Sequence, residues 1–147
     1  MTNQNKIIFI DTETGGLHPA HHSLLSIALV EWVNGEIIQT TEILVDDGEL
    51  KATEAALAIN KIDLKSHKAS AFSPQEAIQE ILTFIGWTSD QDEKVNRAGH
   101  NVGFDIRFTH QLLESQDYHF DDYFSHRSID TSSILHYLYL SGKLCLI

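Results

Sequence analysis

The sequence has almost no cysteine, because Cys145 is the only one among its 147 residues. No disulfide can therefore form within the chain, and this composition fits a reducing compartment. Long hydrophobic runs are lacking as well, and the apolar segment Ile7–Ile10 is far too short to span a membrane. The N-terminal segment Met1–Lys6 is polar and has no signal-peptide core. We therefore expect a cytoplasmic protein.

Basic residues are also scarce. Lysine and arginine number 10 whereas aspartate and glutamate number 21, which gives a net charge of −11. Because binding to a nucleic-acid backbone depends on basic side chains, this balance argues against a protein that grips long duplexes. It argues less against an enzyme that holds only a strand end and brings it to metal ions, since part of the acidity would then belong to the metal site.

The apolar content is ordinary and predicts one domain. Hydrophobic residues make up 42% of the 147 positions, which is enough for one sizeable core and too little for two. No internal repeat and no linker divides the chain. We therefore treat residues 1–147 as a single domain.

Three strands are predicted in the first third of the chain. Lys6–Asp11 reads as a short buried strand rich in isoleucine, and the glycines and proline of Thr12–Pro19 indicate a loop after it. Leu24–Trp32 is the second strand. An Asn-Gly dipeptide follows, which is a strong hairpin signal, so Glu36–Val45 should return antiparallel to the second strand.

Helices and strands alternate in the rest of the chain. A capping box starts one helix, with Ser73 as the cap, Pro74 at the first helical position and Glu76 closing the box. Apolar spacing and capping signals predict further helices at Ala52–Asn60, Gly103–Ser115 and from Asp130 to Gly142, strands at Val95–Ala98 and Arg127–Ile129, and a polar loop at Ser89–Lys94. This order favours an α/β fold, with a mixed sheet whose first three strands are antiparallel and which is flanked by helices.

Two carboxylates stand close together at the end of the first predicted strand. Side chains two residues apart on a strand point the same way, so Asp11 and Glu13 would lie side by side. Ionised carboxylates in one pocket repel each other, and a hard divalent cation such as Mg²⁺, which prefers oxygen ligands, relieves that repulsion. On spacing alone, a pair of acids that simply faces solvent is the more common explanation.

A third acid, Asp105, falls in the first turn of the helix predicted at Gly103–Ser115. A carboxylate at this position complements the helix dipole, which is by itself a sufficient reason for its presence. Alternatively, the sheet brings Asp105 to Asp11 and Glu13 as a third metal ligand. The spacing of the residues leaves both explanations open.

Three segments, taken in order, resemble the motifs of one enzyme family. Asp11-Thr-Glu13-Thr-Gly-Gly-Leu17 resembles the first exonuclease motif of the DEDD superfamily, in its proofreading-subunit and ribonuclease T-like branch. His100-Asn-Val-Gly-Phe-Asp105 resembles the second motif. Between them, a segment around Ile59 resembles the part that contacts the terminal nucleotide in these enzymes. The resemblance extends over essentially the whole chain.

This resemblance implies a ribonuclease H-like fold and a 3′→5′ exonuclease, which hydrolyses phosphodiester bonds and releases nucleoside monophosphates. It implies two divalent cations, Mg²⁺ or Mn²⁺, and the single-stranded 3′ end of DNA or RNA as the partner. The implied catalytic and metal-binding residues are Asp11, Glu13 and Asp105, with Asp11 shared by both ions. The implied substrate-binding residues are Thr14, Leu17, Ile59, His100 and Phe104.

The third motif of the family, a histidine and an aspartate separated by four residues, is not found before the sequence ends at Ile147. The nearest substitute is His126 with Asp130, but its spacing is one residue short and Asp130 fits better as a helix cap. Tyr137 and Tyr139 lie on a helix that is predicted to pack, so neither replaces the tyrosine of the motif's variant. The other histidines show no zinc-type pairing and are expected on the surface. We expect the fold to be incomplete at its C-terminal end and this chain alone to be weak or inactive.

Several explanations of this ending stay open. A fragment of a longer protein, a frameshifted gene and a site completed by a partner chain all fit it, and a homodimer is a further expectation. The rival to the exonuclease is a non-catalytic module of the same fold that binds nucleic acid or protein. A less favoured alternative is an unrelated α/β protein with fortuitous carboxylates. DNA ends, tRNA ends and short oligoribonucleotides are all used within the superfamily, so the substrate stays open too.

Overall fold

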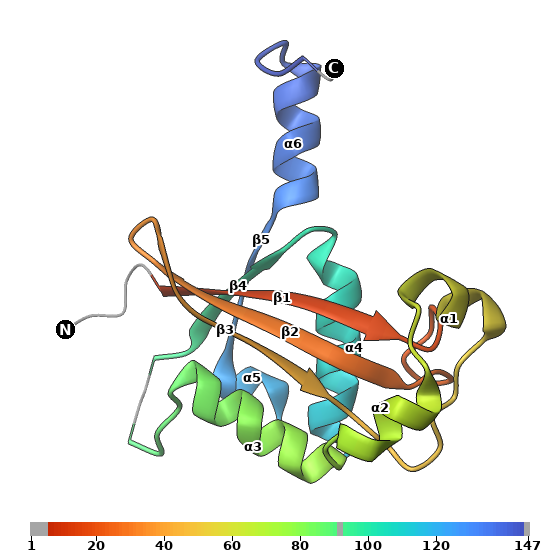
Figure 1. The fold of residues 1–147 in the computed structure, drawn as a ribbon. Helices are drawn as coiled ribbons and strands as arrows, with labels where there is room; N and C mark the ends of the chain where they lie inside the picture. Colours follow the sequence, from red (N-terminus) through yellow and green to blue (C-terminus); the bar gives the residue numbers. More distant parts are fainter. Residues whose placement is uncertain (1–5, 91–92, 146–147) are drawn as a thin grey trace.

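The computed structural model describes residues 6–90 and 93–145. The predictions for the N-terminus, for residues 91–92 of the polar loop and for residues 146–147 lie outside the described residues. The sheet has five strands in the order β3-β2-β1-β4-β5, and Figure 1 shows their arrangement. Its strands are β1 Lys6–Thr14, β2 Leu24–Val33, β3 Glu36–Leu44, β4 Val95–Gly99 and β5 Phe124–Asp130.

The pairing of the strands confirms the mixed sheet. β1 pairs antiparallel with β2, and β2 pairs antiparallel with β3. On the other side, β1 pairs parallel with β4, and β4 pairs parallel with β5. Because parallel strands end at the same edge of a sheet, the residues that follow β1 and β4 meet there.

β1 is longer than the sequence predicts. The predicted loop at Thr12–Pro19 was placed too early in the sequence, because the strand continues through Thr14. The cause lies in the neighbouring strand, since β2 provides a partner for every residue of β1 from Lys6 to Thr14. This pairing keeps the acidic motif extended, so the alternation of its side chains continues to the end of the strand.

Four of the helices were predicted and two were missed. The predicted ones are α1 Glu54–Asn60, α3 Pro74–Ile85, α4 Val102–Glu114 and α6 Thr131–Leu140. α3 begins with the expected capping box, in which Ser73 and Glu76 each accept a hydrogen bond from the backbone of the other. The missed helices are α2 Leu64–Ser70 and α5 Phe120–Tyr123, with 7 and 4 residues, which is too short for an apolar repeat to show. None of the helices in the described ranges is long and apolar enough to cross a membrane.

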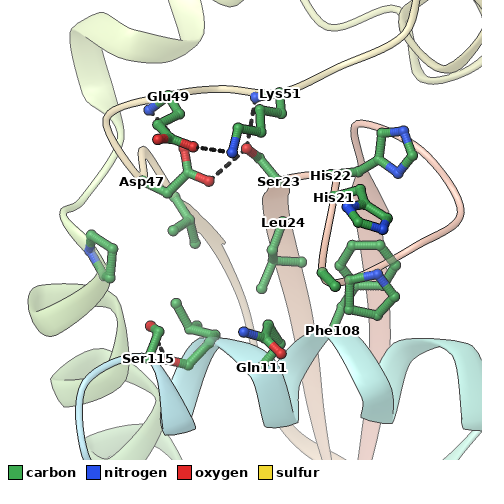
Figure 2. Close-up of a pocket in the computed structure, with 15 residues that line it drawn as sticks. His21, His22, Ser23, Leu24, Asp47, Glu49, Lys51, Phe108, Gln111 and Ser115 are labelled. Atoms are coloured by element: carbon green, nitrogen blue, oxygen red, sulfur yellow. Dashed lines mark hydrogen bonds and ion pairs between the residues drawn. The ribbon is translucent and has the colours of Figure 1, made fainter.

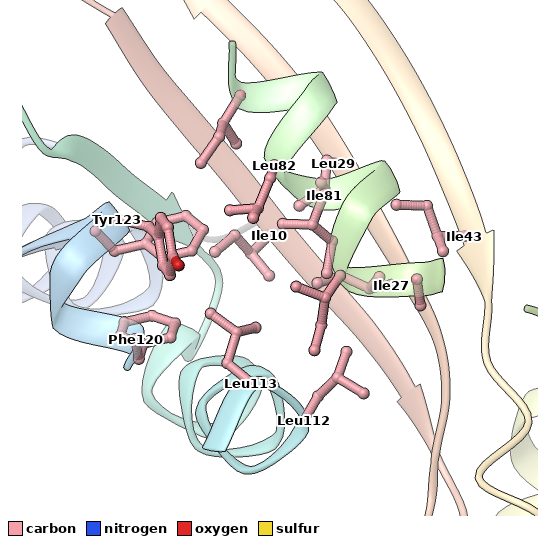
Figure 3. Packing of buried hydrophobic residues seen from close by; sticks show 14 of the residues in the cluster. Ile10, Ile27, Leu29, Ile43, Ile81, Leu82, Leu112, Leu113, Phe120 and Tyr123 are labelled. Carbon is pink, nitrogen blue, oxygen red and sulfur yellow. The ribbon is translucent and has the colours of Figure 1, made fainter. Parts of the chain in front are cut away.

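The core lies between one face of the sheet and the helices α3, α4 and α5. Figure 3 shows side chains of these elements interlocking, among them Ile10, Ile27, Leu29, Ile81, Leu113 and Phe120. Alternate residues of β1 enter this core, beginning with Ile8. The residues between them, including Asp11 and Glu13, therefore point to the other face of the sheet.

Gly99 ends β4 and lets the chain turn tightly into α4. A Cβ at this position would lie 2.8 Å from the carbonyl oxygen of Ile10 and 2.8 Å from a methyl group of Val102, so a side chain does not fit. Asn101 completes the turn with φ 56°, in the left-handed region that asparagine tolerates. The first turn of α4 is thereby placed beside the end of β1.

α6 does not pack as the sequence predicts. It has no buried residue, and Figure 1 shows it extending away from the sheet. Tyr137 and Tyr139 are 63% and 47% exposed, so the expectation that they pack is wrong. The physical reason is the position of α6, which follows the edge strand β5 and continues beyond the sheet instead of folding back over it.

Candidate active site

Asp11 and Glu13 lie on the same face of β1, as the strand periodicity predicts. Both side chains are exposed, whereas Thr12 and Thr14, which alternate with them, are each only 9% exposed. The two carboxylates are therefore presented to solvent near the end of the central strand, and the two threonines are turned inward.

Asp105 is carried to the same strand end by α4. Its side chain is buried, and its Oδ1 accepts two hydrogen bonds from Thr12, one from the backbone N–H at 2.9 Å and one from Oγ1 at 2.8 Å. The N–H of Thr12 is available because the pairing of β1 with β4 ends at Phe9 and Ala98. Asp105 thus replaces the missing strand partner and ties α4 to the residue between the two exposed acids.

Electrostatic repulsion links the three acids. Although Glu13 is exposed, partial desolvation of its carboxyl group raises its pKa, and the charges of Asp11, of Glu42 on β3 and of Asp105 raise it further. Burial also raises the pKa of Asp105, against the lowering effect of the hydrogen bonds from Thr12, and the charge of Asp11 adds to the increase. A divalent cation among these oxygens would lower both pKa values, because it favours the ionised form of each carboxyl group.

The ligand chemistry of the three acids fits a hard cation such as Mg²⁺ or Mn²⁺, since both prefer oxygen ligands. Within residues 6–90 and 93–145, however, no three His, Cys, Asp or Glu side chains already stand in a metal-binding arrangement. Asp11 and Glu13 are exposed and can rotate, whereas Asp105 is held by Thr12. The donor set is therefore suitable in its chemistry but is not preassembled.

A cavity of about 460 Å³ lies beside Glu13. Its lining includes four of the five substrate-binding residues that the resemblance implies, namely Thr14, Leu17, Ile59 and Phe104. Leu17, from the loop after β1, is 71% exposed and Ile59, from α1, is 82% exposed. A cavity that has a carboxylate in its wall and exposed apolar side chains from two elements suits a single nucleotide.

The wall formed by α1 is fastened to the end of β1. The backbone N–H of Thr53, the N-cap of α1, donates to the Gly15 carbonyl at 2.8 Å, and Asn60 Nδ2 donates to the Thr14 carbonyl at 3.2 Å. Gly15 permits this close approach, because a Cβ there would lie 2.0 Å from the carbonyl oxygen of Lys51. The packing around α1 therefore explains the first glycine of the motif.

His22 is a lining residue that the sequence did not indicate. Its ring fills the space that a side chain at Gly16 would need, since a Cβ there would lie 2.5 Å from the ring. His18 stacks on His22 with ring centroids 6.0 Å apart and planes inclined by 28°, and both rings line the cavity beside Glu13. The expected surface position holds for His18, but His22 is half-buried.

His100 lies outside this cavity. Its Nδ1 is 3.3 Å from Oγ1 of Thr131, and its side chain lines a different hollow, of about 380 Å³, together with Asp11. The structure therefore places His100 near Asp11 and the start of α6, and does not bring it together with Phe104.

Asp130 caps α6, as predicted. Its Oδ1 accepts hydrogen bonds from the backbone N–H groups of Ser132 at 2.9 Å and Asn101 at 3.0 Å. Although burial opposes the change, these hydrogen bonds lower the pKa of Asp130. His126 is exposed on β5 and its carbonyl accepts a hydrogen bond from Arg97 at 3.3 Å. The carboxylate of Asp130 is thus used for capping α6.

A smaller cavity, of about 180 Å³, is also lined by His22, and Figure 2 shows its lining. The polar and charged groups at its rim have partners within the rim. Ser23 Oγ donates to Asp47 at 2.5 Å, and Lys51 Nζ lies 2.5 Å from the carboxylate of Glu49. None of the three acids of the candidate site lines this cavity, so we do not assign catalysis to it.

The fold and these residues define a class of protein, the ribonuclease H-like nucleases with acids on the central strand and on a following helix. Comparison with known proteins then gives the family. A family model of the RNase T type, described as Exonuclease, matches residues 8–141. The chain belongs to this exonuclease family, which confirms the resemblance to 3′→5′ exonucleases.

Two bacterial oligoribonucleases are similar in sequence. The chain is 26% identical over 144 residues to the oligoribonuclease of Shewanella loihica and to that of Sodalis glossinidius, and the match covers 90% of this chain and 74% of each relative. Among solved structures, a complex of Escherichia coli exonuclease I with single-stranded DNA superimposes with a TM-score of 0.77 at 19% identity. That match covers 92% of this chain but only 30% of exonuclease I, and it confirms the fold.

Proposed function

We propose that Asp11, Glu13 and Asp105 bind divalent cations and hydrolyse phosphodiester bonds at nucleic-acid 3′ ends, with release of nucleoside monophosphates. The observation that carries this proposal is the double hydrogen bond from Thr12 to Asp105, which holds the third acid at the residue between the other two. The raised pKa of Glu13, which reflects burial and the charges around it, supports the same site, because a bound cation would relieve the repulsion.

The proposed cofactors are two ions of Mg²⁺ or Mn²⁺. Bound cations of this kind activate a water molecule and stabilise the leaving oxygen. Asp11 is the proposed ligand of both ions, and Glu13 is the proposed ligand of the ion that activates water. Asp105 would help to hold the same ions, directly or through a bound water molecule. Carboxylate oxygens favour these hard ions over softer metals.

The proposed substrate is the 3′ end of a single strand. The cavity beside Glu13 has room for one nucleotide, and the exposed side chains of Leu17 and Ile59 suit contact with a base. The net charge of −11 fits an enzyme that holds a short end and not a long strand. The names of the relatives point to oligoribonucleotides in one comparison and to single-stranded DNA in the other. Our proposal therefore includes both RNA and DNA 3′ ends.

We propose that these 147 residues by themselves have only weak exonuclease activity. We also propose that the protein is cytoplasmic. Hydrolysis needs a water molecule that is aimed and deprotonated, and a positioned general base contributes on the order of 10²- to 10⁴-fold. Asp130 is engaged as a helix cap, so the described residues offer no convincing third motif. We also propose that the chain forms a homodimer or that a partner chain completes the site. The alternative is that this domain is a non-catalytic module of the same fold.

Metal binding tests this proposal directly. Mn²⁺ should raise the Tm of the wild type, because a ligand that binds only the folded state stabilises it, by about 2.7 kcal/mol at roughly 100 times Kd. Asp11→Ala should abolish the increase, whereas Glu80→Ala, at an exposed position of α3, should retain it. Equal Tm values in chelator and in millimolar Mn²⁺ for all three proteins would refute the site and favour the non-catalytic module.

A further inference from the structure

Thr12 makes a contact that the acids on either side of it do not make. It lies between the two exposed acids of the motif, but its own side chain is turned inward. Both of its donors, the backbone N–H and the hydroxyl, bind the same atom, Oδ1 of Asp105, at 2.9 and 2.8 Å. The two residues are 93 positions apart in the chain, so this contact is tertiary and does not follow from a local turn.

We propose that Thr12 is a positioning residue, which fixes the carboxylate of Asp105 through Oδ1 and so reserves Oδ2 for the metal ions or their bound water. This inference rests on the proposed function. A single hydrogen bond would leave the carboxylate able to rotate about χ2, whereas two donors from one residue restrict both its place and its rotation. Both donors of Thr12 bind Oδ1, so Thr12 itself does not occupy Oδ2.

Burial strengthens the effect of this contact. Asp105 is 4% exposed and Thr12 is 9% exposed, so water does not readily replace a hydrogen bond lost between them. Partners that orient a metal ligand in this manner typically change metal affinity by roughly 10- to 100-fold when they are removed. The hydroxyl of Thr12 should therefore affect metal affinity although it touches neither metal nor substrate.

Three substitutions separate orientation from general packing. Thr12→Val keeps the branched shape and the backbone N–H, and removes only the hydroxyl. Thr12→Ser keeps the hydroxyl in a smaller side chain. Thr109→Val is the matched control, because Thr109 is fully buried and its hydroxyl donates to the backbone carbonyl of Asp105 at 2.8 Å. That control removes a buried hydrogen bond to the same residue without touching its carboxylate.

The measurement is the Kd for Mn²⁺ by isothermal titration calorimetry, at a temperature where every variant is folded, with the Tm of each recorded in chelator. We expect Thr12→Val to increase the Kd about tenfold. We expect Thr12→Ser and Thr109→Val to bind within about twofold of the wild type, even though Thr109→Val lowers the Tm through its lost hydrogen bond.

Two results would overturn the role of Thr12 and leave the metal site standing. One is wild-type affinity in Thr12→Val together with loss of binding in Asp105→Asn. The other is equal weakening in Thr12→Val, Thr12→Ser and Thr109→Val, because a general loss of packing would then explain the effect. Absence of Mn²⁺ binding in the wild type would instead refute the proposed function, and the inference with it.

Discussion

At the scale of single residues, Glu13 is a side chain whose charge depends on its surroundings. Partial desolvation raises its pKa, and the charges of Asp11, Glu42 and Asp105 raise it further. A carboxyl group whose pKa is raised on folding stabilises the protein below its ordinary pKa, and this contribution is lost as the pH rises through the raised value. Without metal, Glu13 should therefore make the folded chain less stable at neutral pH than at acidic pH.

Glu13→Gln removes this charge and keeps the shape of the side chain. In chelator at neutral pH we expect it to raise the Tm, because the repulsion from Asp11 and Asp105 disappears. The gain should vanish below the ordinary pKa of glutamate, where the wild-type side chain is already protonated. Scanning fluorimetry at both pH values measures the effect, with Glu80→Gln on α3 as a control that should leave the Tm unchanged. A lower Tm for Glu13→Gln at neutral pH would contradict the electrostatic account.

Gly15→Ala should destabilise the protein by about 1–3 kcal/mol or more. The added Cβ would lie 2.0 Å from the carbonyl oxygen of Lys51, which is backbone and cannot swing aside. Gly103→Ala is the control, because its Cβ would meet nothing closer than 3.9 Å and alanine is favourable in a helix. Urea denaturation gives both free energies of unfolding, and equal values would show that the Lys51 backbone does not lie against Gly15 in this way.

The three acids of the candidate site were predicted from the sequence, because strand alternation and the order of the motifs point to them. Thr12 was not, since its partner lies 93 positions away and a threonine in a strand is ordinary. His22 was missed for a similar reason. Its place in the lining depends on ring packing over Gly16, which no spacing in the sequence encodes.

At the scale of elements, α3 and α6 differ in what holds them. α3 has 12 residues, a capping box and five buried side chains, whereas α6 has 10 residues and no buried side chain. Isolated helices of this length are marginal in water, and α6 lacks the buried contacts that stabilise α3. The sequence predicted the helix correctly from its cap and apolar spacing. It could not predict the packing, because that requires a surface to pack against.

Hydrogen exchange should separate these two helices. At a protein concentration where the chain is monomeric, backbone amides in the last two turns of α6 should exchange nearly as fast as those of an unfolded peptide, since local opening costs little where no apolar contact is lost. Amides of α3 around Ile81 and Leu82 should be strongly protected, because opening would expose the core. Mass spectrometry of peptic fragments measures both. Equal protection in α6 and α3 would show that α6 is covered in solution.

At the scale of the whole molecule, exposed apolar side chains gather on α6, namely Ile134, Leu135, Tyr137, Tyr139 and Leu140. Such patches favour association, so we expect the sedimentation coefficient to rise with protein concentration. Ile134→Glu should shift the chain toward the monomer, because it places a charge in the patch. Ser133→Glu, its neighbour on the same helix, should have a smaller effect. A constant monomeric value for the wild type over a wide concentration range would contradict this expectation.

The central claim is that Asp11, Glu13 and Asp105 catalyse removal of nucleotides from a 3′ end. Its most direct test is shortening of a 5′-labelled single-stranded oligonucleotide in Mn²⁺, by the 147-residue chain and by the same chain extended with a helix that carries a His-x₄-Asp motif. We predict weak shortening by the first, shortening on the order of 10²- to 10⁴-fold faster by the second, and loss of both with Asp11→Ala. Robust shortening by the 147-residue chain that survives Asp11→Ala, or that His126→Ala abolishes, would contradict this account.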